Sequence, residues 1–274
     1  MVYFAVSSMF FHEYPLEEIF DLVCESGLDT MEFWMETPHF WLRDLPEDEL
    51  AACIQKNPDR PIPSIHAPVL DLNPCSINPD VAAISVEYTA RAISLAGRIG
   101  SGVVTVHPGR RTAKRSPSDA DYRRFEYYLD RLEEVSRGKQ HVTVAIENME
   151  RKVNSLLCTP ESVRELLDRE EWLGFTLDVS HAMGTSTDEV YRYLDLCHDR
   201  LSNIHMSRSN GGTQHLPVRG SKVMADILVY ICDLGYRGCI TLEIEDRNFA
   251  RDLSSEEKII ILAGEVEFMR NSVG

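Results

Sequence analysis

Short apolar runs alternate with longer amphipathic segments along the whole chain, and this rhythm constrains the fold more than any other feature. A β-rich run followed by a helical segment is typical of a parallel βα unit. The chain holds eight such runs, at 2–6, 28–34, 62–66, 102–107, 141–147, 173–178, 201–206 and 238–245. Eight units in one chain predict a closed (β/α)₈ barrel rather than an open sheet.

The length and the helix signals agree with one barrel. The chain has 274 residues, and a barrel of this kind needs about 250. No shift in composition and no linker divides it, so we expect a single domain over 1–274. The pair Thr159-Pro160 predicts a helix start. The segment 80–99 predicts a helix that packs on the barrel through Val81, Ile84, Tyr88, Ala92 and Leu95.

The charge balance argues against two classes of partner. The formal net charge is −16, from 28 Lys and Arg against 44 Asp and Glu. An acidic surface repels phosphate backbones and anionic membranes. Nucleic acid is therefore a disfavoured partner, and we expect a small-molecule substrate.

The cysteines and the N-terminus indicate the compartment. The seven cysteines are scattered and form no C-x-x-C pair, which suits a reducing cytosol. The first residues lack a basic segment and reach an acid at Glu13, so we predict no signal peptide. No apolar run approaches the roughly 20 residues that span a bilayer. We expect a cytoplasmic protein, and the sequence leaves a homo-oligomer open.

Potential metal ligands recur at the ends of six consecutive predicted strands. A lone histidine or glutamate at a strand end is usually structural, but a parallel barrel brings all its strand ends to one face. Imidazole and carboxylate ligands suit Zn²⁺, Mn²⁺, Fe²⁺ and Co²⁺. The residues concerned are His66, His107, Glu147, Asp178, His181, His205 and Glu243. They predict a divalent-metal site at the C-terminal face of the barrel.

One loop is basic within this acidic chain. Residues 108–119 follow the fourth predicted strand and carry Arg110, Arg111, Lys114 and Arg115. The loop is either a solvated surface or a lid that contacts an anion over the site, because βα loops border that face. The sequence does not decide between these two interpretations.

The strand-end motifs carry a resemblance to a known group of proteins. IHAP, VHPG, ENM, LDVSHA, the histidine of strand seven and LEIE occur in order along the whole chain. In this the chain resembles the xylose isomerase-like barrel superfamily, which includes sugar phosphate isomerases and epimerases, inositol-catabolism enzymes and the endonuclease IV family. The resemblance implies a shared metal site of Glu147, Asp178, His205 and Glu243.

The resemblance to ketose 3-epimerases implies a mechanism. A divalent ion (Zn²⁺, Mn²⁺ or Co²⁺) would act as a Lewis acid on the substrate carbonyl and stabilise an enediolate. Glu147 and Glu243 would be the catalytic residues and exchange protons with carbon on opposite sides of the substrate. His181 would hydrogen-bond a substrate oxygen.

The resemblance to endonuclease IV implies a different use of the same face. Its first zinc would take His66, His107 and Glu147, so His66 and His107 are candidates for a second metal site. Its third zinc would take His181 and His215 with an aspartate, but that position is Thr213 here. The acidic surface also fits DNA poorly.

Two further features concern the substrate. Isomerase relatives often read HLPLGEG where this chain reads HLPVRGS at 215–221. His215 and Arg219 are therefore candidate substrate contacts, although Arg219 fits a surface charge equally well. Glu32, Trp34, Phe10 and Phe11 are expected near the same face, either as core or as an apolar wall against a sugar.

The leading hypothesis is a divalent-metal-dependent isomerase or epimerase of a small sugar- or polyol-derived carbonyl compound. The first alternative is a zinc phosphodiesterase or abasic-site endonuclease resembling endonuclease IV. The second is a barrel that binds a metal or ligand without catalysis. The complete set of four ligands argues against the last.

Overall fold

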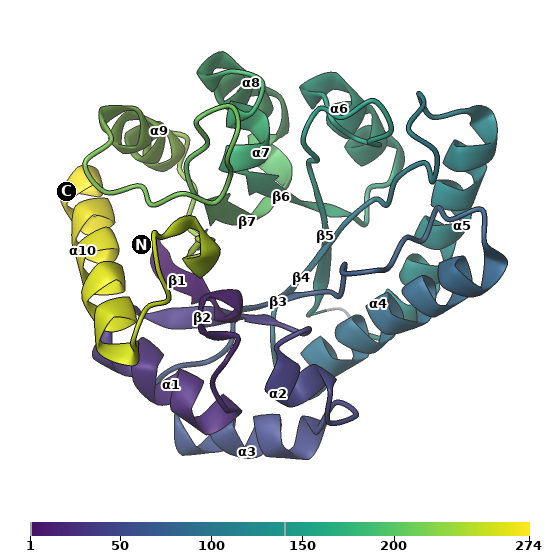
Figure 1. The fold of residues 1–274 in the computed structure, drawn as a ribbon. Coiled ribbons are helices and arrows are strands. Elements are labelled where there is room, and N and C mark those ends of the chain that lie inside the picture. Colours follow the sequence, from purple (N-terminus) through teal and green to yellow (C-terminus); the bar gives the residue numbers. More distant parts are fainter. Residues whose placement is uncertain (1, 140) are drawn as a thin grey trace.

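The computed structural model describes residues 2–139 and 141–274 and confirms the closed parallel barrel. The eight strands lie in sequence order around the barrel, and β1 closes it by pairing with β8 (Figure 1). The strands are β1 (Tyr3–Ser7), β2 (Thr30–Trp34), β3 (Ser64–His66), β4 (Val103–Val106), β5 (Thr143–Glu147), β6 (Gly174–Asp178), β7 (Leu201–Met206) and β8 (Cys239–Leu242). Each strand overlaps its predicted run and is shorter at one or both ends in most cases.

Helices surround the strands as an outer layer (Figure 1). They are α1 (Leu16–Glu25), α3 (Glu47–Lys56), α4 (Pro79–Ile99), α5 (Asp119–Ser136), α6 (Pro160–Arg169), α8 (Thr187–Cys197), α9 (Lys222–Asp233) and α10 (Ser255–Val273). Short segments lie in the connections: α2 (Pro38–Trp41), α7 (Val179–Met183), η1 (Ser8–Phe11), η2 (His198–Arg200) and η3 (Asp246–Asn248). Thr159 caps α6 through the amide of Ser162, with Pro160 at the first helical position as predicted.

The buried face of α4 differs from the predicted one. Ala92 and Leu95 are buried, but Ile84 is 37% exposed. The helix instead turns Ser85 and Thr89 inward. Their hydroxyls donate to the carbonyls one turn earlier, at 2.6 and 3.0 Å, so burying them leaves no unpaired polar group. A prediction from apolar spacing alone cannot anticipate hydroxyls that pair with their own helix.

Polar side chains fill part of the barrel interior. Thr105 and Thr176 hydrogen-bond each other at 2.9 Å, and Asn203 reaches Glu32 at 2.6 Å. Because β2 and β7 are not neighbours in the sheet, the contact between Asn203 and Glu32 runs through the interior. This layer lies beneath the C-terminal ends of the strands, where the metal-ligand residues are found.

No helix in the described part of the chain combines the length and the apolarity needed to cross a bilayer.

Candidate metal centre

The four predicted ligands of the shared metal site converge at one point. Glu147 and Asp178 end β5 and β6, His205 lies near the end of β7, and Glu243 directly follows β8. One potential ligand atom from each lies within 4.8 Å of the others. All four side chains are buried. The parallel barrel thus assembles residues that are 96 positions apart at the extremes, Glu147 and Glu243. We call these four residues the four-ligand group.

The four-ligand group contains buried polar atoms that make no hydrogen bond within the described residues. Glu147 Oε2, Asp178 Oδ2, His205 Nδ1 and Glu243 Oε2 are buried without a hydrogen-bond partner. Three carboxylates around one imidazole place a concentration of negative charge in a water-excluded site, which is costly without a compensating cation. Oxygen and imidazole donors in this number suit a divalent transition metal or zinc. The residues present therefore fit the metal that the sequence predicted.

Two histidines face the same glutamate from the other side. His107 Nε2 lies 3.0 Å from Glu147 Oε2, and His66 Nε2 lies 3.5 Å from it. The other ring nitrogen of His66, Nδ1, lies 2.8 Å from the carbonyl of Ala67, which turns Nε2 toward Glu147. We call His66 and His107 the histidine pair. With Glu147 it forms a second set of potential ligands, as predicted for a second metal.

His181 and His215 lie beside Asp178 and form a third set of donors. His181 follows β6 in α7, and its amide donates to Asp178 Oδ1 at 2.6 Å. His215 Nδ1 lies 3.7 Å from Glu243 Oε2. Thr213, which stands where the endonuclease pattern has aspartate, is exposed. This third set therefore has one carboxylate fewer than that pattern.

The structure does not bring Arg219 to these residues. A Cβ placed on Gly264 of α10 would collide with the Arg219 guanidinium, so this side chain lies along the outer helix. Its amide donates to Glu265, also on α10, at 2.8 Å. The prediction of Arg219 as a substrate contact is not supported by this placement, and the interpretation as a surface charge fits it.

The histidines and carboxylates shift one another's pKa values. Burial alone would lower the pKa of His66 and His181, but Glu147 raises that of His66 to about 9. Asp178 and Glu147 raise that of His181 to about 9 in the same way. Burial lowers the pKa of His107, so this ring is neutral. Without a metal, protons on histidine supply part of the positive charge that the carboxylates need.

The carboxylates respond to their positions within the cluster. Burial would raise the pKa of Glu147 and Glu243, but the surrounding histidines hold both well below the usual range. Burial does raise the pKa of Asp178. Burial would lower the pKa of His205, yet Glu243, Glu32 and Glu147 raise it well above its ordinary value. Both glutamates are therefore ionised bases at neutral pH.

The start of the basic loop is fixed rather than free. The Asn73 amide group donates to the Arg110 carbonyl and accepts from its N–H, at 2.8 and 2.9 Å. Asn154 is joined to Arg111 through two further bonds, at 2.9 and 3.0 Å. Gly109 has φ +78°, and a Cβ there would lie 2.9 Å from Asn73 Oδ1. These contacts argue against a hinged lid at this end of the loop.

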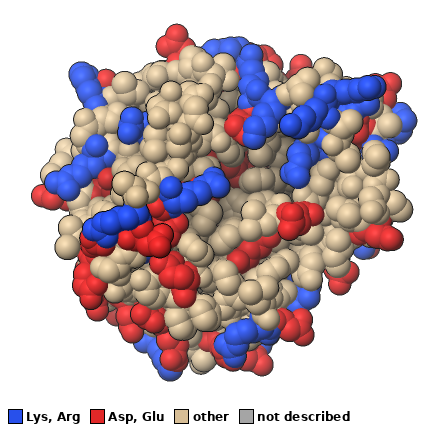
Figure 2. Space-filling model, viewed as in Figure 1, with Lys and Arg blue, Asp and Glu red and all other residues tan. Residues whose placement is uncertain are grey.

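Acidic and basic side chains are distributed unevenly over the face of the barrel that contains the metal-ligand residues. Figure 2 shows acidic side chains around the central hollow and cationic ones along its upper right and left edges. Arg110 and Lys152 line a cavity of about 120 Å³ that also touches His107. Lys114 and Arg115, farther along the loop, are exposed.

Sequence reasoning missed two buried residues, Asn148 and Lys258, that fix segments at the strand ends. Asn148 accepts from the Asp178 amide at 2.8 Å and donates to its carbonyl at 3.0 Å, so it fixes the end of β6. Lys258 of α10 is fully buried and donates to the Phe10 carbonyl at 2.7 Å and to Asp246 at 3.1 Å. No motif marks these positions. Phe10 and Phe11 are fully buried, which makes them core rather than a substrate wall.

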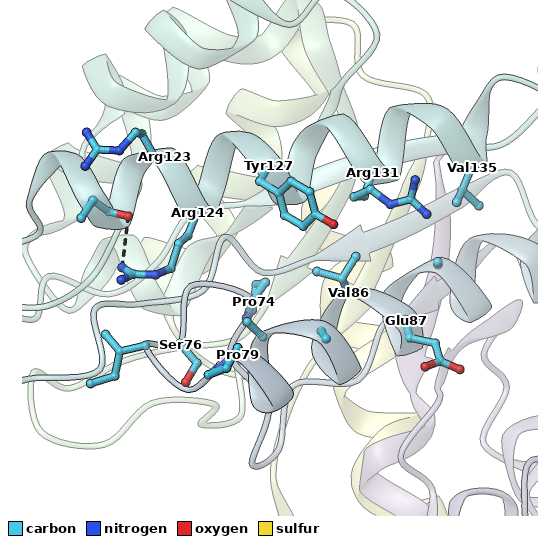
Figure 3. A pocket seen from close by; sticks show the side chains of 15 residues that line it. Pro74, Ser76, Pro79, Val86, Glu87, Arg123, Arg124, Tyr127, Arg131 and Val135 are labelled. Atoms are coloured by element: carbon cyan, nitrogen blue, oxygen red, sulfur yellow. Dashed lines mark hydrogen bonds between the residues drawn. The ribbon is translucent and has the colours of Figure 1, made fainter.

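A large groove lies away from these residues. It has about 830 Å³ and runs along the outside of the barrel between α4 and α5. Arg123, Tyr127 and Arg131 of α5 line one wall, and Val86 and Glu87 of α4 line the other (Figure 3). It contains none of the predicted site residues, so size does not identify the site in this protein.

Comparisons with known proteins agree with the fold. A family model described as a xylose isomerase-like TIM barrel matches residues 20–270. An uncharacterized protein of Methanocaldococcus jannaschii is 33% identical over 276 residues, with 100% of each chain covered. A probable endonuclease 4 of Akkermansia muciniphila is 24% identical over 197 residues, covering 67% of this chain and 69% of its own. Among solved structures, a D-tagatose 3-epimerase-like protein superposes with a TM-score of 0.76 at 24% identity, with 100% of each chain covered.

Proposed function

Since the chain belongs to the xylose isomerase-like TIM-barrel family, we propose that it is a divalent-metal-dependent isomerase or epimerase. Its substrate would be a small carbonyl compound derived from a sugar or polyol. The observation that carries the proposal is the convergence of one potential ligand atom from each of four buried side chains, Glu147, Asp178, His205 and Glu243. Solved structures of the same fold include several sugar epimerases, which supports the reaction class.

The four-ligand group would hold the ion, with Zn²⁺, Mn²⁺ or Co²⁺ as candidates because one ligand is imidazole. When bound, the ion supplies Lewis-acid polarisation of the substrate carbonyl, which acidifies the neighbouring C–H. Asn148 holds the backbone of Asp178 in place. The site therefore needs no large rearrangement of β6 to present its carboxylate.

Glu147 and Glu243 would transfer the protons. They come from β5 and from the end of β8, so they reach the substrate from two sides. One glutamate, ionised, removes the proton next to the carbonyl, and the other, which must be protonated in the substrate complex, supplies a proton to the opposite side. Inversion at that carbon requires two such groups, and the four-ligand group contains them.

His181 and His215 would orient the substrate. Both lie beside Asp178, and His181 Nδ1 is 3.0 Å from the Asn148 carbonyl, which leaves Nε2 free for a substrate oxygen. An imidazole donor at that oxygen stabilises the negative charge that develops on it. The net negative charge of the chain, and a site whose substrate donors are two imidazoles, favour a small molecule over nucleic acid as the substrate.

A second candidate function has one observation in its favour. His66 and His107 add a second set of ligands around Glu147, and two-metal sites of this kind hydrolyse phosphate esters. The match to a probable endonuclease 4 agrees with that interpretation. The net charge of −16 and the exposed threonine at 213 weigh against it.

The test is exchange of substrate hydrogen with solvent. The protein loaded with Mn²⁺, Co²⁺ or Zn²⁺ is incubated in D₂O with a panel of ketoses and inososes, and deuterium at carbon is read by mass spectrometry and NMR. The proposal expects deuterium next to the carbonyl of at least one compound, lost in Glu243→Gln. Cleavage of abasic DNA without any such exchange would favour the second candidate.

A further inference from the structure

A charged side chain occupies the interior of the barrel. Glu32 of β2 has no exposed surface, whereas barrel interiors are mostly filled by branched apolar residues. A buried carboxylate is costly unless its oxygens are satisfied. No Lys or Arg pairs with Glu32 in the described part of the chain, and its contacts are Ser64, Asn203 and His205. The cost of burying this charge calls for a function that an apolar residue could not perform.

The two oxygens of Glu32 have different partners. Oε2 accepts from Ser64 Oγ at 2.8 Å and from Asn203 Nδ2 at 2.6 Å. Thr241 Oγ1 donates to Asn203 Oδ1 at 3.2 Å, and this bond fixes the amide with its NH₂ group toward Glu32. Oε1 lies 2.9 Å from His205 Nε2, and both atoms are buried with no hydrogen-bond partner among the described residues, so each is the nearest polar atom that could satisfy the other.

This geometry indicates which ring nitrogen of His205 would bind an ion. A carboxylate oxygen near Nε2 can only accept, so Nε2 keeps its proton when the other nitrogen binds a metal. Nδ1 lies 3.1 Å from Glu243 Oε2 and 3.6 Å from Glu147 Oε1, among the other ligands, and is the nitrogen that would exchange its proton for the ion. We infer that Glu32 is a positioning residue that fixes the orientation and tautomer of His205 and so makes Nδ1 a metal ligand. This inference rests on the proposed function, because it concerns the same metal site.

Substitution by glutamine tests the inference because of the asymmetry between the two oxygens. Ser64 and Asn203 both donate to the Oε2 position, so the introduced amide must place its oxygen there. Its NH₂ group then faces His205 Nε2, which has to accept instead of donate. The single proton of a neutral His205 ring is then on Nδ1, and Nδ1 can no longer bind a metal. Glu32→Gln changes no side chain of the four-ligand group and almost no volume.

A second substitution should reverse the first. In Glu32→Gln/Asn203→Asp, the introduced aspartate accepts from the glutamine NH₂ group and still accepts from Thr241. The glutamine oxygen is then turned toward His205 Nε2, and the proton returns to Nε2. Ser64→Ala is the matched control, because it removes one donor to Glu32 without reaching His205.

The experiment is a titration of each metal-free protein with Co²⁺, followed by visible absorption. We expect Glu32→Gln to weaken binding about 10- to 100-fold, the range for outer partners of a ligand histidine. The double variant should regain most of the affinity, and Ser64→Ala should stay within about threefold of wild type. Wild-type affinity in Glu32→Gln, or no recovery in a folded double variant, would overturn the inference. If Glu32→Gln does not fold, the double variant must still bind Co²⁺ like wild type.

A second readout is the ring nitrogen that binds the ion. ¹⁵N spectra of labelled histidine in the Zn²⁺-saturated proteins distinguish the metal-bound nitrogen from the protonated one. We expect His205 to bind through Nδ1 and to keep its proton on Nε2 in wild type and in the double variant. Zn²⁺ on Nε2 of His205 in wild type would overturn the inference. Zn²⁺ bound through Nδ1 in a protein that exchanges no substrate hydrogen would contradict the proposed function but not the role of Glu32.

Discussion

The two sets of ligands that share Glu147 differ in charge and in enclosure. The four-ligand group combines three carboxylates with one imidazole, and its unpartnered atoms are all buried. The histidine pair, His66 and His107, adds two imidazoles to the same glutamate, and the side chain of His107 is 24% exposed. One set is strongly anionic and closed, and the other is nearly neutral and partly open.

This difference separates a required ion from an optional one. Three buried carboxylates need a cation whatever else the site does. The histidine pair needs no metal to balance Glu147. The pKa of His66 is about 9, so its ring is positively charged at neutral pH, whereas the pKa of His107 is lowered and its ring is neutral. We therefore expect one tightly held ion, in the four-ligand group, with the histidine pair as a lower-affinity addition.

The largest effect is expected where the two sets meet. Glu147→Gln removes the one residue that both sets share, so it should abolish metal retention and lower turnover by at least about 100-fold. Elemental analysis and the deuterium exchange assay measure the two effects. Glu134→Gln, an exposed carboxylate on α5, is the control and should change neither. Retention of one full ion in Glu147→Gln would mean that the two sets do not share their central ligand.

The pH dependence of stability tests whether protons replace the missing cation. The pKa of His66 and of His181 is raised to about 9 in the folded protein, from about 6.5. Their stabilisation is complete below about pH 6.5 and is lost as the pH rises through 9. For each histidine this amounts to at most about 3 kcal/mol.

The measurement is thermal unfolding between pH 6.5 and 9, with a chelator and with saturating Mn²⁺. The unfolding temperature of the chelated protein should fall over this range. The decline should be smaller with Mn²⁺, because a bound cation removes the attraction of Glu147 for the histidine protons. Equal slopes in the two series would contradict this account of the cluster charge.

A smaller change should affect the histidine side alone. Gly109 follows His107 by two residues and adopts φ +78°, where alanine is strained and would press on Asn73. Gly109→Ala should cost about 1–2 kcal/mol of unfolding free energy. It should leave the ion in the four-ligand group in place. Loss of the ion in this variant would show that the two sets behave as one unit, and denaturant unfolding with metal analysis distinguishes the cases.

The smallest effect is expected at Arg219. Its side chain lies along α10, away from both sets of ligands. Arg219→Gln should therefore leave metal content unchanged and turnover within about twofold, as for a surface substitution. A rise in KM for an anionic substrate, with metal content unchanged, would restore the interpretation of Arg219 as a substrate contact.

Strand order and strand ends could be predicted because they rest on simple periodicity. Eight apolar runs specified the closed barrel, and parallel strands bring their carboxyl ends together whatever the details. That geometry placed Glu147, Asp178, His205 and Glu243 within reach of one ion. The same reasoning brought His66 and His107 to Glu147.

The features that were left open or misassigned depend on where side chains turn. The loop carrying Arg219 crosses to α10, and nothing in its sequence states that direction, so the sequence left a substrate contact and a surface charge equally open. Ile84 was assigned to the buried face of α4 from the spacing of apolar residues. That spacing does not count Ser85 and Thr89, whose hydroxyls are buried because they bond carbonyls of the same helix. Glu32 was placed near the site without a role, because its partners come from two other strands, Ser64 from β3 and Asn203 and His205 from β7. Such contacts depend on closure of the barrel and leave no local pattern.

The most direct test of the central claim is the metal content of chelator-free, untagged protein, measured by elemental analysis beside His66→Ala and Glu243→Gln. The account predicts one Mn²⁺, Co²⁺ or Zn²⁺ per chain in wild type, retained in His66→Ala and lost in Glu243→Gln. Two or more zinc ions, with one lost in His66→Ala, would contradict the single required ion and favour phosphoester hydrolysis. No bound metal, even after incubation with these ions, would contradict the metal centre itself.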